Sequence, residues 1–169
     1  MRSADCIGSS DRSGVVYQNE GNLLLLSLLS SSVRTVLDVG CGAGDNARVI
    51  RTINENIEIV GITLSAEESK LARQHMTAVH VVDLDVSDLS FLGDRRFDAV
   101  IFSHVLEHVK DPQRVLNLSA RHLRVGGQML IAVPNVLFAS SRVILNTRTA
   151  GLWTALTYIS SPGIQQIAI

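Results

Sequence analysis

A glycine-rich turn directly after a buried strand is the feature that most constrains how this chain can fold. Residues 36–39 are apolar except for Asp38, and Gly40, Gly42 and Gly44 follow at alternate positions before a helix-like segment. At such a junction, backbone without side chains can approach a ligand closely, and the helix presents free N–H groups. Because a plain tight turn seldom needs three glycines, the pattern predicts a ligand site at the carboxyl end of a parallel strand.

The rest of the chain alternates short β-branched runs with helical segments, which predicts an α/β fold with a doubly wound, mostly parallel, Rossmann-like sheet. The 169 residues fit a single domain, with residues 1–14 as a flexible lead-in. The expected strands cover residues 35–39, 57–62, 78–82, 99–102 and 128–133, and the expected helices cover residues 45–54, 66–75 and 112–123.

Composition excludes several classes of partner. The net charge is −1 and no Lys/Arg cluster occurs, so we expect no nucleic-acid partner. No run reaches the roughly 18 apolar residues that a membrane span needs, because Ser27 interrupts the most apolar stretch, residues 23–29. The two cysteines, Cys6 and Cys41, have no metal-ligand spacing and suit a reducing compartment, so we expect a cytoplasmic protein. The sequence leaves the oligomeric state open.

The turn is compatible with two kinds of ligand. Residues 42–47 also fit the dinucleotide fingerprint, so an NAD(P)-dependent oxidoreductase is an alternative. Two features oppose it: the second strand ends at Thr63 where an acid would bind a ribose, and Asp45 lies where a pyrophosphate would approach. A ligand with a cationic centre and one carboxylate suits Asp38 and the glycines better.

Five ordered motifs then carry a family resemblance. They lie at residues 36–44, 97–101, 105–109, 111–112 and 123–127. Together they resemble the class I S-adenosylmethionine-dependent methyltransferases, especially the branch that acts on small molecules and on sugar or quinone precursors. The resemblance implies S-adenosylmethionine as cofactor, lying across the carboxyl ends of the strands. It also implies methyl transfer to a small-molecule, sugar or lipid-precursor acceptor.

Within the glycine-rich turn, the resemblance places Asp38, Gly40 and Gly42 beside the methionine end of the cofactor. Cys41 and Gly44 complete the cofactor-binding turn.

Beyond the turn, the resemblance implies that Asp85 and Val86 contact adenine, with Asp83 as the alternate carboxylate. It implies that the backbone carbonyl of Ser103 faces the methionyl ammonium.

Thr63 departs from the family pattern, since most members carry Asp or Glu there to bind both ribose hydroxyls. Residues 61–65 are instead similar to a variant seen in cyclopropane fatty acid synthases, which implies that Thr63 and Glu68 share the ribose. Ser65 and Glu68 also fit a capping box at a helix start, so a purely structural role for Glu68 stays open.

A histidine cluster follows the fourth expected strand. His104, Glu107 and His108 form an H-x-x-E-H pattern that zinc enzymes use, but no glutamate follows Glu107 to complete such a site, so we expect no metal. In the methyltransferase resemblance this segment closes the pocket beside the transferable methyl. His104 is then the candidate general base, because histidine ionises near neutral pH, and Glu107 or His108 serves or orients it. A packed structural role for the histidines stays open.

The tail, residues 147–169, is atypical. Family members continue here with a Gly-x-x-Asp-x-Thr-His-Leu segment and two more strands, whereas no charged residue follows Arg148. We therefore expect a C-terminally truncated domain whose sheet lacks its last two strands. A catalytically impaired cofactor-binding fragment is the corresponding alternative function.

We predict that this tail is translated out of frame. If each codon over residues 150–162 is read from its third base, the sequence permits Gly-(Leu/Ile)-Met-Asp-x-Thr-His-Leu, and the Asp is forced because the Trp153 codon precedes that of Thr154. Restoring the frame should yield a longer, more soluble protein with a higher melting temperature. A gene in which the shifted frame lacks these codons or meets an early stop would contradict the prediction.

Overall fold

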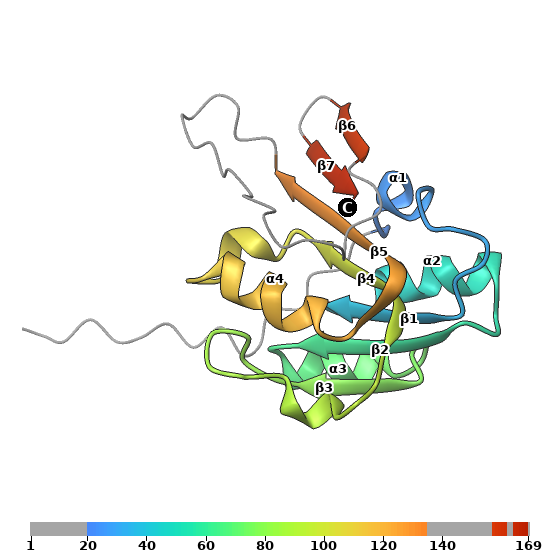
Figure 1. The fold of residues 1–169 in the computed structure, drawn as a ribbon. Helices are drawn as coiled ribbons and strands as arrows, with labels where there is room; N and C mark the ends of the chain where they lie inside the picture. Colours follow the sequence, from blue (N-terminus) through green and yellow to red (C-terminus); the bar gives the residue numbers. More distant parts are fainter. Residues whose placement is uncertain (1–19, 135–156, 162–163, 169) are drawn as a thin grey trace, which may run out of the picture.

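A twisted sheet in the order β3-β2-β1-β4-β5-β7-β6 forms the centre of the fold (Figure 1). The structure, a computed structural model, describes residues 20–134, 157–161 and 164–168. The strands are β1 (Thr35–Val39), β2 (Glu58–Thr63), β3 (Ala78–Val81), β4 (Phe97–Ser103), β5 (Leu123–Pro134), β6 (Thr157–Ser161) and β7 (Ile164–Ala168). Because β1 pairs in parallel with both β2 and β4, the strand order reverses at β1, where ligands bind in such sheets.

Side-chain caps mark the start of several helices. The helices are α1 (Leu23–Leu26), α2 (Asp45–Ile53), α3 (Ala66–Ala72) and α4 (Pro112–Ala120), with 3-10 turns η1 (Ser90–Leu92) and η2 (Leu106–His108). The Ser65 side chain caps α3, and the Asp111 side chain caps α4 just before its initial proline. None of the helices in the described ranges is long and apolar enough to cross a bilayer.

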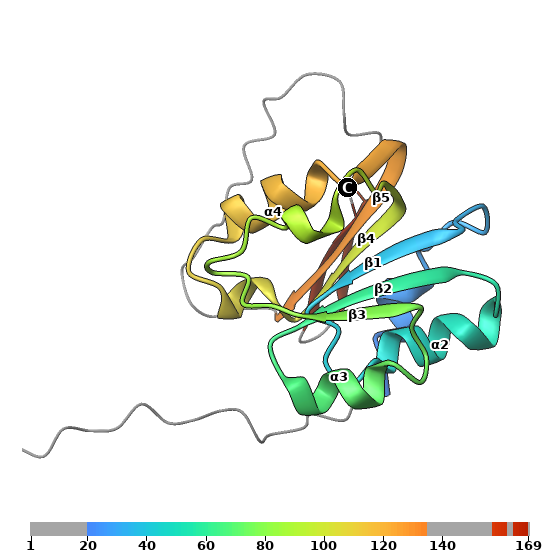
Figure 2. The same ribbon diagram turned by 90° about the horizontal axis from the view of Figure 1, so that it is seen from below.

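Helices cover both faces of the sheet, with α2 and α3 on one face and α4 on the other (Figure 2). Alternate strand residues supply the two cores: Val36 and Ile59 pack in the core that includes α2 and α3 residues, whereas Leu37 and Val60 pack in the core that includes α4 residues. Since side chains alternate along a strand, Asp38 of β1 lies on the α2 and α3 face.

The structure confirms the doubly wound, mostly parallel sheet and its five expected strands. The largest boundary difference lies between α4 and β5: the last helix was expected to reach Leu123 and the last strand to begin at residue 128, but α4 ends at Ala120 and Leu123 begins β5. Leu123 is buried and pairs with Phe97, and a register shift between Phe97 and Ala99 accommodates the extra residues of β5 before Gln128 pairs with Ala99. The pairing of Leu123 with β4 therefore outweighs the helical periodicity of the sequence around it. The helix expected over residues 66–75 also ends early, at Ala72.

The expected loss of the last two strands is corrected by the structure. Strand β7 pairs antiparallel with β5 over Leu130–Pro134, and β6 pairs antiparallel with β7. The physical reason is that β5 would otherwise present a row of unpaired backbone groups, and the antiparallel pair of β6 and β7 covers this edge. The proposed lead-in (1–14) and most of the atypical tail lie outside the described residues, and the frame hypothesis stays a prediction.

A carboxylate ties three strands together at the amino end of the sheet. Asp98 of β4 accepts hydrogen bonds from the backbone N–H groups of Arg34 and Thr35 (both 2.9 Å), from the Thr35 hydroxyl (3.0 Å) and from the Arg124 guanidinium of β5. Partial burial by itself raises the pKa of Asp98, but these hydrogen bonds outweigh it and hold the pKa below its usual value.

We predict that Asp98→Ala lowers the free energy of unfolding by about 2–4 kcal/mol, because it leaves two backbone donors and a guanidinium without their acceptor. Urea unfolding measures the loss, and Asp94→Ala, at an exposed residue of the same segment, is the control. Since folding lowers the Asp98 pKa, its stabilisation is present above the usual value of 3.8 and disappears as pH falls through the folded-state value. An Asp98→Ala loss no larger than that of Asp94→Ala would contradict the prediction.

Candidate cofactor-binding and catalytic site

The candidate site lies where the carboxyl ends of four parallel strands meet. Val39 of β1 pairs with Ile62 of β2 and with Phe102 of β4, and Thr63 pairs with Val81 of β3. The four loops that follow these strands therefore emerge along one edge of the sheet. These loops contain all the residues that the sequence nominated, except Asp38, Thr63 and Ser103 at the strand ends and Glu68 in α3.

The three glycines of the turn have different roles. All have positive φ (+74°, +53° and +90° for Gly40, Gly42 and Gly44). A Cβ at Gly40 would overlap the Val105 side chain, and one at Gly44 would lie 2.8 Å from the Ala72 Cα, so these two glycines permit close packing. A Cβ at Gly42 would meet only the Glu68 carboxylate, at 3.9 Å. Gly42 is thus the position of the turn with room for a ligand against its backbone.

Asp38 is fully buried behind this turn, and neither carboxylate oxygen completes a hydrogen bond with a described residue. Burial raises its pKa to about 7; the nearby Asn46 side chain lowers it less, and the Asp45 charge raises it further. An uncompensated buried carboxylate is costly when ionised. The Asp38 carboxylate lies behind the open backbone at Gly42, and this arrangement favours a ligand that carries positive charge.

Glu68 supplies a second carboxylate, from the first turn of α3. The Thr63 hydroxyl donates to Glu68 Oε2 at 2.9 Å, and both side chains are buried. The Ser65 hydroxyl accepts from the Glu68 N–H at 3.2 Å, so Glu68 also takes part in the cap that the sequence suggested. Its carboxylate, however, bonds to Thr63 at the end of β2. A carboxylate from the next helix thereby reaches the end of β2, where residue 63 itself carries none.

The turn is consequently a region of negative potential. Burial raises the pKa of the Cys41 thiol, and the charges of Asp38 and Glu68 raise it further, so the thiol stays protonated and is a poor nucleophile. The Cys41 backbone ties the turn to β2, because its N–H donates to the Ile62 carbonyl at 2.8 Å. Asp45 adds a third carboxylate at the start of α2. A pyrophosphate would be repelled here, which argues against the oxidoreductase alternative.

The loop after β3 carries the nominated adenine contacts. Asp85 Oδ1 accepts from the Lys110 N–H at 2.8 Å, and Asp83 Oδ1 accepts from the Asp85 N–H at 2.8 Å. Val86 in this loop is 77% exposed, and Leu64, just past β2, is 69% exposed. Exposed apolar side chains after neighbouring strands suit the faces of an aromatic ring. Sequence reasoning missed Leu64; an apolar residue directly past the last paired residue of a strand was the available signal.

The histidine cluster lies after β4. His104 has φ +57°, unusual for a residue with a side chain, and its Nδ1 lies 3.6 Å from Glu107 Oε1. Its backbone N–H donates to the Ala132 carbonyl at 2.9 Å, which fixes the residue against β5. His108 is exposed, and Ser103 is partly buried at the tip of β4. In the part of the chain that the structure describes, no three His, Cys, Asp or Glu side chains converge as metal ligands.

Comparison with known proteins identifies the family. Residues 37–131, more than half of the chain, match a family model described as a methyltransferase domain. This chain belongs to that methyltransferase family. The class I S-adenosylmethionine-dependent methyltransferase resemblance drawn from the five motifs is therefore confirmed.

Curated relatives of this methyltransferase-family chain include two ubiquinone biosynthesis O-methyltransferases. One, from Alkalilimnicola ehrlichii, is 33% identical over 106 residues, covering 60% of this chain and 42% of the relative. The other, a mitochondrial protein from Candida albicans, is 34% identical over 118 residues, covering 67% of this chain and 36% of the relative. The chain thus spans about two fifths of the length of the relatives that it matches.

Solved structures show the same fold. The [4+2]-cyclase SpnF aligns with a TM-score of 0.55 at 27% identity, covering 66% of this chain and 43% of that chain. The plantazolicin methyltransferase BpumL, in complex with SAH, aligns with a TM-score of 0.55 at 17% identity, covering 65% of this chain and 42% of that chain. The second likeness shows the fold alone.

We predict that Gly42→Asn abolishes binding of S-adenosylhomocysteine while leaving the fold intact. Asn tolerates positive φ, and its side chain would fill the open space above the turn. Gly126→Asn is the matched control, because Gly126 has φ +78°, lies outside the site near the start of β5, and a Cβ there would meet nothing within 4 Å. Calorimetry measures binding; wild-type affinity in Gly42→Asn would show that the ligand does not contact this turn.

The raised pKa of Asp38 yields a prediction about stability and pH. The folded chain holds this proton up to about pH 7, whereas an unfolded chain releases it near 3.8. The contribution of Asp38 to stability should therefore fall as pH rises between these values, by about 1.4 kcal/mol for each pH unit. Asp38→Asn should remove this slope from the free energy of unfolding measured between pH 5 and 7. Parallel slopes in the wild type and the variant would contradict the prediction.

Proposed function

We propose that this chain binds S-adenosylmethionine and transfers its methyl group to a hydroxyl of a small molecule, or of a sugar or lipid precursor. The observation that carries the proposal is the buried carboxylate of Asp38 beside the open backbone of Gly42, a combination that suits a cationic ligand. The family match and the relatives named ubiquinone biosynthesis O-methyltransferases support it. The buried free thiol of Cys41 supports a cytoplasmic, reducing location.

The residues fit the parts of the cofactor in order along the sheet edge. Asp38, Gly40 and Gly42 hold the methionine end, together with the Ser103 carbonyl at the tip of β4. In the next segment, the Glu68 carboxylate, positioned by Thr63, accepts from the ribose hydroxyls.

At the far end, Asp85 accepts from the adenine amine and the Val86 backbone contacts the ring. Leu64 and the Val86 side chain supply apolar contacts to its faces.

The bound cofactor supplies a methyl group that its sulfonium already activates. The chain's own work is to align the acceptor and to exclude water. His104 accepts the acceptor's hydroxyl proton at Nε2, because Nδ1 faces Glu107. The Glu107 carboxylate then stabilises the imidazolium. His108 is the residue that either orients His104 and Glu107 or acts as the general base itself.

The proposal is tested by binding and by turnover. Calorimetry should detect S-adenosylhomocysteine binding and no NAD binding. Transfer of a labelled methyl from the cofactor should then be measured across a panel of phenolic, sugar and lipid-linked hydroxyls. His104→Ala should keep cofactor binding and reduce transfer by about 10²-fold or more. Stabilisation by NAD and not by S-adenosylhomocysteine would overturn the assignment.

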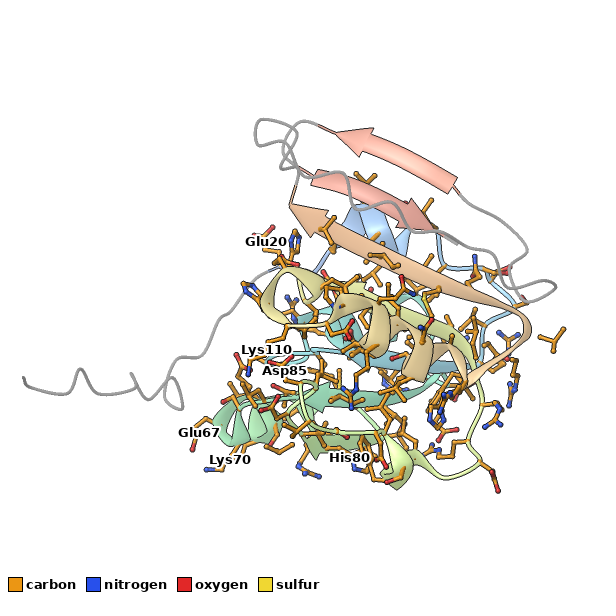
Figure 3. All side chains as sticks on the ribbon, turned by 60° about the vertical axis from the view of Figure 1, so that its left-hand side comes forward. Glu20, Glu67, Lys70, His80, Asp85 and Lys110 are labelled. Carbon is orange, nitrogen blue, oxygen red and sulfur yellow. The ribbon has the colours of Figure 1, made fainter. Side chains whose placement is uncertain are left out.

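We predict that Glu68→Gln weakens S-adenosylhomocysteine binding by roughly tenfold to a hundredfold, the loss of one charge-assisted hydrogen bond. Glu67→Gln is the matched control: the same helix turn loses the same charge, but Glu67 points to solvent toward Lys70, at 3.8 Å (Figure 3). Thr63→Asp should also weaken binding, because it sets a second carboxylate against Glu68. Tighter binding by Thr63→Asp would show that residue 63 is the ribose site.

A further inference from the structure

The segment that follows β3 is anchored to a helix on the other side of the candidate site. Residues 83–88, here called the adenine loop, receive two hydrogen bonds from the Arg114 guanidinium of α4. Arg114 Nη1 donates to the Leu84 carbonyl at 3.0 Å, and Nη2 donates to the Ser87 carbonyl at 2.5 Å. The two carbonyls flank Asp85 and Val86, the two residues that we assign to adenine.

The same loop is tied to the segment before α4. The Lys110 N–H donates to Asp85 Oδ1 at 2.8 Å, and Figure 3 shows the two residues side by side. The Arg114 N–H donates in turn to the Asp111 carboxylate at 2.9 Å. The start of α4 therefore holds both the backbone of the adenine loop and the carboxylate that points from it.

Apart from Arg114 and Lys110, the loop is held mainly at its two ends, where the Val82 N–H donates to the Thr63 carbonyl and Leu89 is buried. Asp83, Val86 and Asp88 are exposed, and only Leu84 packs against the core. Within the loop, the Val86 and Ser87 N–H groups donate to the Asp83 carbonyl, at 3.4 and 3.0 Å. These local bonds form a turn but do not set its position relative to the sheet edge.

We propose that Arg114 is a positioning residue for the recognition of a 6-aminopurine nucleoside by the adenine loop. The planar guanidinium is the side chain that can bridge two carbonyls at once, whereas a lysine ammonium would hold one. Fixing both carbonyls orients Asp85 toward the amino group of the purine. This inference rests on the proposed cofactor-binding function.

The experiment compares two ligands: S-adenosylhomocysteine and the same thioether whose purine lacks the 6-amino group. Wild type should bind the first about tenfold more tightly, the value of one hydrogen bond to a charged acceptor. Arg114→Met should lose this preference, with both ligands bound about equally weakly, and Arg114→Lys should lose most of it. Arg121→Met, a loss of the same charge at the exposed end of α4, should keep the wild-type preference.

Two further measurements separate positioning from general stability. The double variant Asp85→Asn/Arg114→Met should bind S-adenosylhomocysteine no more weakly than Asp85→Asn alone, because both changes remove one interaction. Amide hydrogen exchange at residues 86 and 87 in the ligand-free chain should accelerate in Arg114→Met and not in Arg121→Met.

The outcomes are distinct. A preserved preference in Arg114→Met, or an equal fold-loss for both ligands, overturns the positioning role and leaves the proposed function intact. Failure of the wild type to bind S-adenosylhomocysteine overturns the proposed function and this inference with it, whatever the exchange rates. Loss of the preference together with faster exchange supports the proposal.

Discussion

The burial of the Asp38 carboxylate at the end of β1 is the constraint on which the candidate site depends. The glycine-rich turn covers it so closely that Val105 packs where a Gly40 side chain would be, and Ala72 packs where a Gly44 side chain would be. These contacts bring the loop after β4 and the end of α3 against the turn. Because burial raises the pKa of Asp38 to about 7, ionising this carboxylate in the ligand-free chain is costly, and the proposed cationic ligand would offset that cost. The proposal thereby links binding and folding through one residue.

The sequence predicts the elements whose signals are local. Strand β1 has the expected bounds because a continuous apolar run ends at a glycine, and α4 starts as expected because Asp111 and Pro112 define its first turn. The start of β5 was missed, because pairing of Leu123 with Phe97 decides it, and so were β6 and β7, because the free edge of β5 decides them. Contacts between distant segments determine these three outcomes, and helical or strand periodicity does not encode them.

The same distinction applies within the site. The glycines and Asp38 are identifiable from spacing. For Glu68, the sequence predicted either a ribose contact or a role in a helix cap and could not choose between them. The structure shows that the Glu68 N–H bonds to Ser65 in the cap while the Glu68 carboxylate accepts from Thr63. Arg114 gave no signal at all, since an arginine in the first turn of a helix is ordinarily a solvated charge. Its relevance depends on two backbone carbonyls about 30 positions earlier in the chain.

The described residues include more of the proposed donor site than of the acceptor site. Asp38 of β1, Glu68 of α3 and Asp85 after β3 supply carboxylates to the proposed donor site, whereas the acceptor side is represented by the short segment 103–109. The structural neighbours include a [4+2]-cyclase and a plantazolicin methyltransferase, so this fold accommodates different chemistries and acceptors. A donor site can be conserved in geometry while acceptor choice varies, because the activated methyl requires alignment more than it requires particular acceptor contacts. For this chain, the proposed donor therefore follows from the buried charge at β1, and the acceptor must be found by measuring transfer.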